Sequence, residues 1–200
     1  GNYSVAIGAG ALATQNFTSA TDTYNTAVGE DAGNDITTGI RNTLIGGLAG
    51  DALTDADDNV AVGMLALSTC QLGSANTAVG KDALEDCNPA SAVTMYNSAF
   101  GMGAGANVTT GTFNTFMGAL SGGGANLTGT HNCASGMESL YAITSGSYNC
   151  GLGYQTGAGV TTGEYNICIG YQAGIYNIPI TTGGNNIVIG PYARPSANAA

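Results

Sequence analysis

The sequence lacks the residues from which a thick globular core is usually built. It has no Trp and only four Phe among 200 residues, so bulky side chains are scarce for a domain of this length. Charged residues make up 8% of the chain, against about 25% in ordinary soluble domains. A chain this poor in charge satisfies its backbone groups most simply by pairing them in regular β structure. We therefore expect extended, repetitive structure.

Positive charge is especially scarce, and this excludes several classes of partner. The net charge is −10, and eleven of the thirteen acidic residues lie between Asp22 and Asp86. Such a balance argues against nucleic acid or an anionic membrane surface as partner. No run of about 18 apolar residues is present, so no membrane insertion is expected. The chain also lacks an initiator Met and a signal segment, and we expect it to be a fragment of a longer fibre.

Histidine occurs once, at His131, which excludes a Ser/His/Asp set and zinc-ligand spacing. The paired carboxylates Asp57–Asp58 and Glu85–Asp86 have the chemistry for glycoside hydrolysis, but they fall in expected loops, where a solvated face is the simpler interpretation. An opportunistic calcium site at Asp51, Asp55 and Asp57 is the other alternative, although the Gly/Asp pattern of calcium-binding repeats is absent. We expect no enzyme, no cofactor and no metal site.

The sequence does contain one repeated motif, which occurs in eleven copies. Asn is followed four residues later by Gly in ten copies, and Ser4–Gly8 is an eleventh copy with Ser in place of Asn. Six of the ten successive spacings are 17 residues, and the others are 18 to 21. The longer spacings contain insertions near residues 20, 90 and 178. The ten asparagines are Asn25, Asn42, Asn59, Asn76, Asn97, Asn114, Asn132, Asn149, Asn166 and Asn186.

A repeat of this length, with Gly at its corners and short β-branched runs between them, is typical of a β-solenoid. We expect an all-β fold with a single domain over residues 1–200. Each of about eleven coils should contain two or three short strands. Coils that stack with parallel pairing about 4.8 Å apart would form a rod of roughly 50 Å.

The alternation of side chains within each short strand suggests which residues face inward. Counting Asn as position zero, position three is bulky and apolar, and we interpret it as the coil core: Ile7, Val28, Ile45, Val62, Val79, Phe100, Met117, Leu152, Ile169 and Ile189. Position two then faces outward, and its small residues suit a close-packed subunit interface: Ala6, Ala27, Ala61, Ala78, Ala99 and Ala134. Because one coil buries little apolar surface alone, we expect a parallel homotrimer.

Three further columns follow the same spacing. Stacked Asn amides are expected to form a structural hydrogen-bonded ladder. An aromatic column precedes the Asn, at Tyr24, Tyr96, Phe113, His131, Tyr148 and Tyr165. Its rings are candidates for sugar contact, but we favour a role in sealing the end of each coil's core. Tyr154 and Tyr171 are similarly ambiguous.

The cysteines also fall in register. Cys70 and Cys87 are 17 residues apart, as are Cys133 and Cys150, so each pair should stack in neighbouring coils within disulfide range. Cys133 and Cys150 occupy position one, expected to face inward, and should be reduced. Cys70–Cys87 lies nearer a loop and is the pair we expect to be able to oxidise.

Two stretches resemble known fibre repeats. SVAIGAGALA, at Ser4 to Ala13, resembles the head repeat of YadA-type trimeric adhesins, and TTGEYNICIGYQAG, at Thr161 to Gly174, is more similar still to repeats of bacteriophage tail fibres. The resemblance spans nearly the whole chain and implies a left-handed β-roll in a homotrimer. The usual spacing is longer than that of the adhesin head, and no coiled-coil stalk or membrane anchor follows, which favours the viral fibre.

The expected function is a structural and adhesive rod of a trimeric viral tail fibre, used in host attachment. Its location would be the virion surface, with a host glycan or protein as receptor and with end-to-end self-association as a further contact. The alternative is a bacterial cell-surface adhesin head or a self-assembling extracellular filament. An ice-binding solenoid is disfavoured because Thr pairs such as Thr37–Thr38 and Thr161–Thr162 recur irregularly. A polysaccharide-cleaving tailspike is a further minor alternative.

Overall fold

The computed structural model describes residues 2–175 and 180–195, and within them the chain is all-β, without a helix. No described segment could cross a membrane as a helix. The strands are β1 (Val5–Ile7), β2 (Thr26–Val28), β3 (Thr43–Ile45), β4 (Val60–Val62), β5 (Gly73–Ser74), β6 (Thr77–Val79), β7 (Val93–Thr94), β8 (Ser98–Phe100), β9 (Thr115–Met117), β10 (Cys133–Ser135), β11 (Cys150–Leu152), β12 (Ile167–Ile169) and β13 (Ile187–Ile189).

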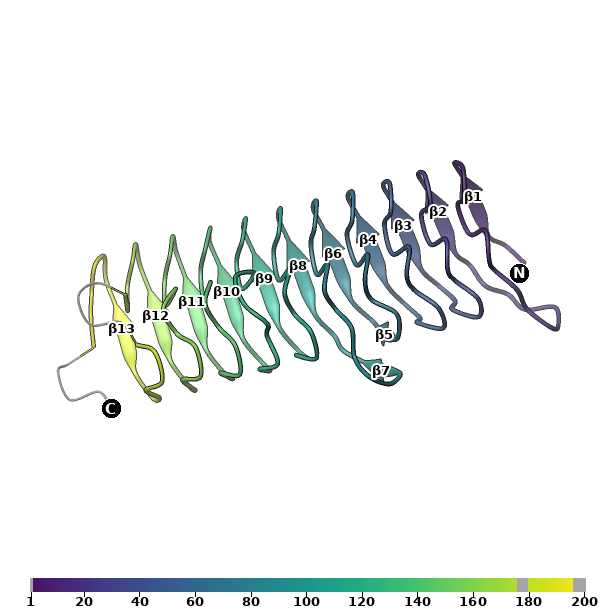
Figure 1. Ribbon diagram of the computed structural model, residues 1–200. Coiled ribbons are helices and arrows are strands. Elements are labelled where there is room, and N and C mark those ends of the chain that lie inside the picture. Colours follow the sequence, from purple (N-terminus) through teal and green to yellow (C-terminus); the bar gives the residue numbers. More distant parts are fainter. Residues whose placement is uncertain (1, 176–179, 196–200) are drawn as a thin grey trace.

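Eleven of these strands form one parallel sheet in chain order, from β1 to β13 with β5 and β7 left out. The strands lie side by side along a rod with β1 and β13 at opposite ends (Figure 1). Equivalent positions of successive copies pair without slippage, for example Ala61 with Ala78 and Val62 with Val79. The expected β-solenoid of about eleven coils is therefore confirmed.

The expectation of two or three strands per coil is wrong for most coils. Each coil has one three-residue strand in the large sheet, and the only second sheet in the described part is the short pair of β5 with β7. The rest of each coil is a series of tight turns whose backbone groups still bond to the next coil. Gly50 N donates to Ala66 O at 2.9 Å, and Leu67 N donates to Ala83 O at 3.1 Å. The turns therefore stack as regularly as the strands, which satisfies their polar groups.

A Gly follows each strand of the large sheet, and it is required there because adjacent coils approach closely. Gly63 has φ 135°, and a Cβ on it would lie 2.5 Å from Gly80 O in the next coil. A side chain has no room at that distance, and L-residues rarely adopt this φ. The same contact recurs from coil to coil, which explains the Asn-to-Gly spacing of the motif.

The core lies on the opposite side of the strand from the one expected. Position two is buried in the solenoid: Ala27, Leu44, Ala61, Ala78, Ala99, Phe116, Ala134 and Cys168 are all 0% exposed. Ala6, in the first coil, is exposed. The predicted interface residues Ala27, Ala61, Ala78, Ala99 and Ala134 are therefore core residues and are inaccessible to another chain.

The predicted coil-core column is correspondingly wrong, because none of its residues is buried. Ile7, Ile45, Phe100, Met117, Leu152 and Ile189 are exposed, and Val28, Val62, Val79 and Ile169 are half-buried. The physical reason is the narrowness of the coil. The turns that make up the rest of each coil form a wall, the wall of turns, which lies close to the sheet. Side chains at position two and side chains from this wall therefore share one thin layer, and that layer cannot hold a bulky residue from every strand.

The side chain at position eight, in the wall of turns, compensates for the size of position two in the same coil. Where position two is Ala, as at Ala61, position eight can be a large buried residue such as Leu67. Where position two is large, as at Leu44 or Phe116, position eight is Gly. A Cβ on Gly50 would lie 2.9 Å from Leu44 Cδ2. The two walls therefore fill the interior jointly.

The insertions leave the stack undisturbed. The segment near residue 20 is joined to the N-terminal residues by a parallel bridge between Asn2 and Asp22. The segment near residue 90 carries β7, which pairs with β5 in the preceding coil and projects from the rod in Figure 1. The expected insertion near residue 178 lies largely outside the described residues.

Candidate functional site

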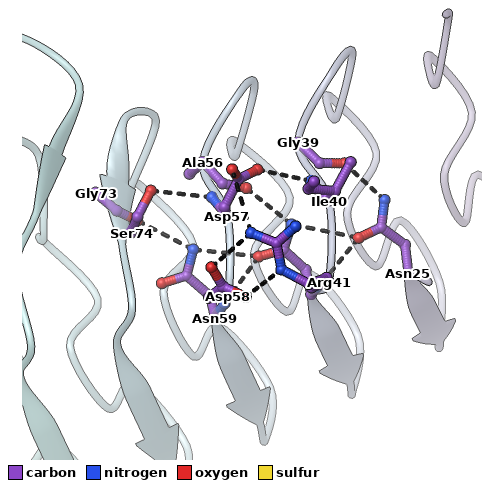
Figure 2. A network of polar contacts seen from close by, with 11 residues as sticks. Asn25, Gly39, Ile40, Arg41, Ala56, Asp57, Asp58, Asn59, Gly73 and Ser74 are labelled. Atoms are coloured by element: carbon purple, nitrogen blue, oxygen red, sulfur yellow. Dashed lines mark hydrogen bonds and ion pairs between the residues drawn. The ribbon is translucent and has the colours of Figure 1, made fainter. Parts of the chain in front are cut away.

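The asparagines form a continuous hydrogen-bonded ladder along the rod. Asn42 Nδ2 donates to Ala56 O at 2.8 Å within its own coil, and Asn42 Oδ1 accepts from the backbone N of Asn59 at 3.0 Å. Asn59 repeats the pattern one coil later, with Gly73 O and Asn76 N as partners. Figure 2 shows this network across adjacent coils. Each amide thus closes its own coil and fastens it to the next.

The ladder is almost fully enclosed. The nine asparagines from Asn25 to Asn166 are at most 1% exposed, and Asn186 is half-buried. Coil-to-coil bonds from backbone N to the preceding Asn Oδ1 measure 2.8 to 3.2 Å. Each amide therefore bonds both within its own coil and to the adjacent coil. This arrangement stabilises the rod.

The residue before each Asn forms a second column, on the outside of the rod. Near the N-terminus this column contains an ion pair: Arg41 Nε lies 2.5 Å from Asp58 Oδ1, and Arg41 Nη2 lies 2.8 Å from Asp58 Oδ2 (Figure 2). The hydrogen bonds from Arg41 lower the pKa of the Asp58 carboxyl and raise that of the guanidinium. Asp57 accepts from Ile40 N at 2.8 Å. The carboxylates of Asp57–Asp58 are thus engaged in fastening adjacent coils.

Farther along, the same column is a stack of aromatic rings. Tyr96, Phe113, His131, Tyr148 and Tyr165 lie in successive coils with ring centroids 5.3, 4.8, 4.9 and 4.8 Å apart and near-parallel planes. The four rings other than His131 are about half exposed, at 46–56%. The expectation that these rings seal the core is therefore wrong. Since each inner ring has its faces against its neighbours, mainly ring edges face solvent, and sugars stack on ring faces.

Two tyrosines form a shorter column just after the strands. Tyr154 and Tyr171 stack at 5.2 Å with an interplanar angle of 18°, and Tyr171 meets Tyr192 edge to face. This column adjoins the sheet, because it lies five residues after the Asn. Exposed methionines occupy the same position in other coils, at Met64, Met102 and Met137.

The outer face of the large sheet is the most distinctive surface of the molecule. Its side chains come from positions one and three of all eleven strands, and none of them is charged. Exposed large apolar residues on it are Val5, Ile7, Ile45, Phe100, Met117, Leu152, Ile167, Ile187 and Ile189. We call these two columns the outer sheet face. An apolar surface that runs the length of a rod is typical of an interaction site.

The cysteines fall in three environments. Cys133 and Cys150 pair in register on the outer sheet face, where Cys133 is exposed and Cys150 half-buried, so the inward orientation expected for them is wrong. Cys168 is in the core, and burial raises its pKa to about 11. Cys70 and Cys87 are fully buried between adjacent coils.

The other candidate groups do not assemble into a site. Among residues 2–175 and 180–195, no three His, Cys, Asp or Glu side chains gather closely enough to hold a metal ion, so Asp51, Asp55 and Asp57 do not form the considered calcium site. The described part of the chain contains no pocket either. Burial, followed by the charges of Asp82 and Asp86, raises the pKa of Glu85.

Sequence reasoning missed the outer sheet face because it assigned the strand's two sides in reverse. A signal was present in the exchange of sizes between positions two and eight, such as Ala134 with Leu140 against Phe116 with Gly122. Residues that exchange volume in this way share one enclosed space.

Comparison of the chain with protein-family models, with curated proteins and with solved structures finds no match in any of the three.

Proposed function

We propose that this chain is a segment of a homotrimeric viral tail fibre, a structural and adhesive rod that acts at the virion surface in host attachment rather than in catalysis. The observation that carries the proposal is the uncharged outer sheet face on a parallel solenoid. The resemblance of Ser4–Ala13 and Thr161–Gly174 to trimeric fibre repeats supports it. The left-handed winding expected from that resemblance belongs to the same proposal.

The apolar outer sheet face supports association. Parallel sheets occur almost only with both faces covered, and here the inner face is covered by the wall of turns. The outer face leaves Ile45 41% exposed, Met117 49% and Leu152 50%. At about 25 cal/mol per Å², covering such side chains contributes substantially along a rod of this length.

The repeat itself selects the partner. Side chains on the outer sheet face recur once per coil, at the spacing of parallel strands, about 4.8 Å. A surface that interdigitates with them along the whole rod needs the same rise per coil. A second and third copy in parallel orientation meet this condition at every coil, and three equivalent copies close around one axis.

The association state tests the structural part of the proposal. Analytical ultracentrifugation of the purified chain is expected to give three times the monomer mass. The double variant Ile45→Glu/Met117→Glu places charges on the outer sheet face and should yield monomer with unchanged β content by circular dichroism. Gln71→Glu, at an exposed turn position, adds a charge away from the sheet and should remain trimeric. A folded wild-type monomer at micromolar concentration would contradict the trimer.

Host attachment needs its own experiment. Fluorescently labelled trimer should bind to susceptible host cells or to a glycan array, with saturation, whereas the monomeric Ile45→Glu/Met117→Glu variant should lose the avidity of three linked sites. Trimer that binds neither cells nor glycans would overturn the adhesive role and leave a spacer.

A further inference from the structure

Three sulfur atoms meet inside the solenoid at one place. Cys70 Sγ lies 2.9 Å from Cys87 Sγ, and Cys87 Sγ lies 3.2 Å from Met95 Sδ. All three residues are 0% exposed. A Cβ on Gly73 would lie 2.7 Å from Met95 Sδ, 2.8 Å from Cys70 Sγ and 3.1 Å from Cys87 Sγ. The absence of a side chain at Gly73 thus leaves the sulfurs room to meet.

The two cysteines replace core aliphatic residues at the same position of successive coils. Both lie eleven residues after the Asn, where other coils place buried Ile36, Leu53, Val108, Ile143 and Val160. Met95 enters from the insertion that carries β7 and fills the space beside the smaller cysteines. A pair of thiols in two consecutive coils therefore stands out against an otherwise aliphatic column.

We propose that Cys70 and Cys87 form a disulfide that joins two neighbouring coils. Equivalent positions in adjacent coils lie about 4.8 Å apart, within the Cα range of disulfides. The thiols already face each other with no atom between them, so bond formation at about 2.05 Å needs only a small approach. The pair Cys133–Cys150 has the same coil-to-coil spacing but differs in its surroundings, because it lies on the outer sheet face rather than in the interior.

The oxidant is a low-molecular-weight disulfide of the glutathione type. One cysteine thiolate attacks it, forming a mixed disulfide and releasing one small thiol. The second cysteine, having lost its proton, attacks the mixed disulfide at the sulfur of the first and releases the other small thiol. Two protein thiols are oxidised, and one small disulfide is reduced to two thiols.

The surroundings favour a neutral bond over bound metal. The hydrogen bond with Cys70, together with burial, raises the pKa of the Cys87 thiol, and a soft metal ion would require thiolate charge in this apolar interior. A disulfide adds no charge. Since burial also withholds the folded thiols from reagents, the bond should form during folding and then resist reduction.

The test uses the chain with Cys133→Ser, Cys150→Ser and Cys168→Ala, which leaves only Cys70 and Cys87. After refolding in a mixture of reduced and oxidised glutathione, the intact mass should be about 2 Da below that of the reduced chain. Non-reducing peptide mapping should recover the fragments containing Cys70 and Cys87 as one linked species. Two free thiols, or glutathione attached to each cysteine, would overturn the proposal.

Matched variants make the result specific. Adding Cys87→Ser to the three-substitution chain should give a folded rod with one free thiol, at Cys70, and no 2 Da loss. In the oxidised protein, dithiothreitol should reduce the bond at least tenfold more slowly under native conditions than in urea. Met95→Ala, which removes the side chain packed on Cys87, should raise the native rate. Equal rates with and without urea would contradict a bond in the folded interior.

Discussion

The ring of Phe116 occupies the space that a side chain on Gly122 would need. A Cβ on Gly122 would lie 2.3 Å from Phe116 Cε1 and 2.5 Å from Cδ1. In the next coil the sizes are reversed, with Ala134 on the strand and Leu140 in the turn, both fully buried. One enclosed volume is thus divided differently between the two walls of each coil.

Exchanging these sizes should move stability in opposite directions. Phe116→Ala alone should destabilise by about 3–5 kcal/mol through a cavity, and Gly122→Leu alone should destabilise because Phe116 occupies the space. The double variant recreates the Ala134/Leu140 arrangement and should recover more than half of the Phe116→Ala loss in urea denaturation. Recovery stays incomplete, because the ring also fills space beside Gly105. Additive losses would show that the positions do not share a volume.

The Gly that follows each strand should be intolerant of any side chain. Gly63→Ala places a Cβ 2.5 Å from Gly80 O at φ 135°, and we expect a loss of about 4 kcal/mol or more, or failure to fold. Gly47→Ala is the control, because a Cβ there would meet only Glu30 O, at 4.0 Å. Thermal unfolding by circular dichroism distinguishes the two, and equal melting temperatures would contradict the close approach.

The Asn ladder should be most sensitive in the middle of the rod. Asn59→Ala removes the partners of Gly73 O and of Asn76 N in a fully buried site, which should cost on the order of 3 kcal/mol. Asn186→Ala, in a half-buried position, should cost less. Hydrogen exchange of the Asn76 amide should accelerate in Asn59→Ala, and an unchanged rate would show that the side-chain bond contributes little.

Asp51 should make stability depend on pH. Burial, followed by the charges of Asp35 and Asp31, raises its pKa, and its Oδ1 is buried without a partner. The folded chain therefore holds this proton more tightly than the unfolded chain. The stabilisation from protonated Asp51 is complete below the ordinary Asp pKa and is lost as pH rises through the raised value.

Asp51→Asn should consequently stabilise the rod at pH 7, by less than about 1 kcal/mol because solvent screens a partly exposed carboxyl, and the gain should vanish at acidic pH. Asp55→Asn removes the same charge from an exposed site and serves as control. Melting temperatures measured across the acidic-to-neutral range give both values. A pH-independent gain would assign the effect to net charge.

The sequence by itself determined the period, the all-β class, the in-register stacking and the places where a side chain is forbidden. Each depends on residues recurring at a fixed interval: stacked coils bring Asn42 beside Asn59 and Gly63 beside Gly80 whatever the rest of the coil does. The tight Asn-to-Gly spacing and the 17-residue interval leave few alternatives to a solenoid.

Only the tertiary structure decided which side of the strand is inside. Alternation separates Ala61 from Val60 and Val62 but is symmetric between the two faces, so hydrophobicity alone favoured the bulkier column as core. The wall of turns breaks that symmetry. Its own side chains, such as Leu67, occupy the thin interior, so most strands have room there only for a small residue. The bulkier Val60 and Val62 therefore face outward.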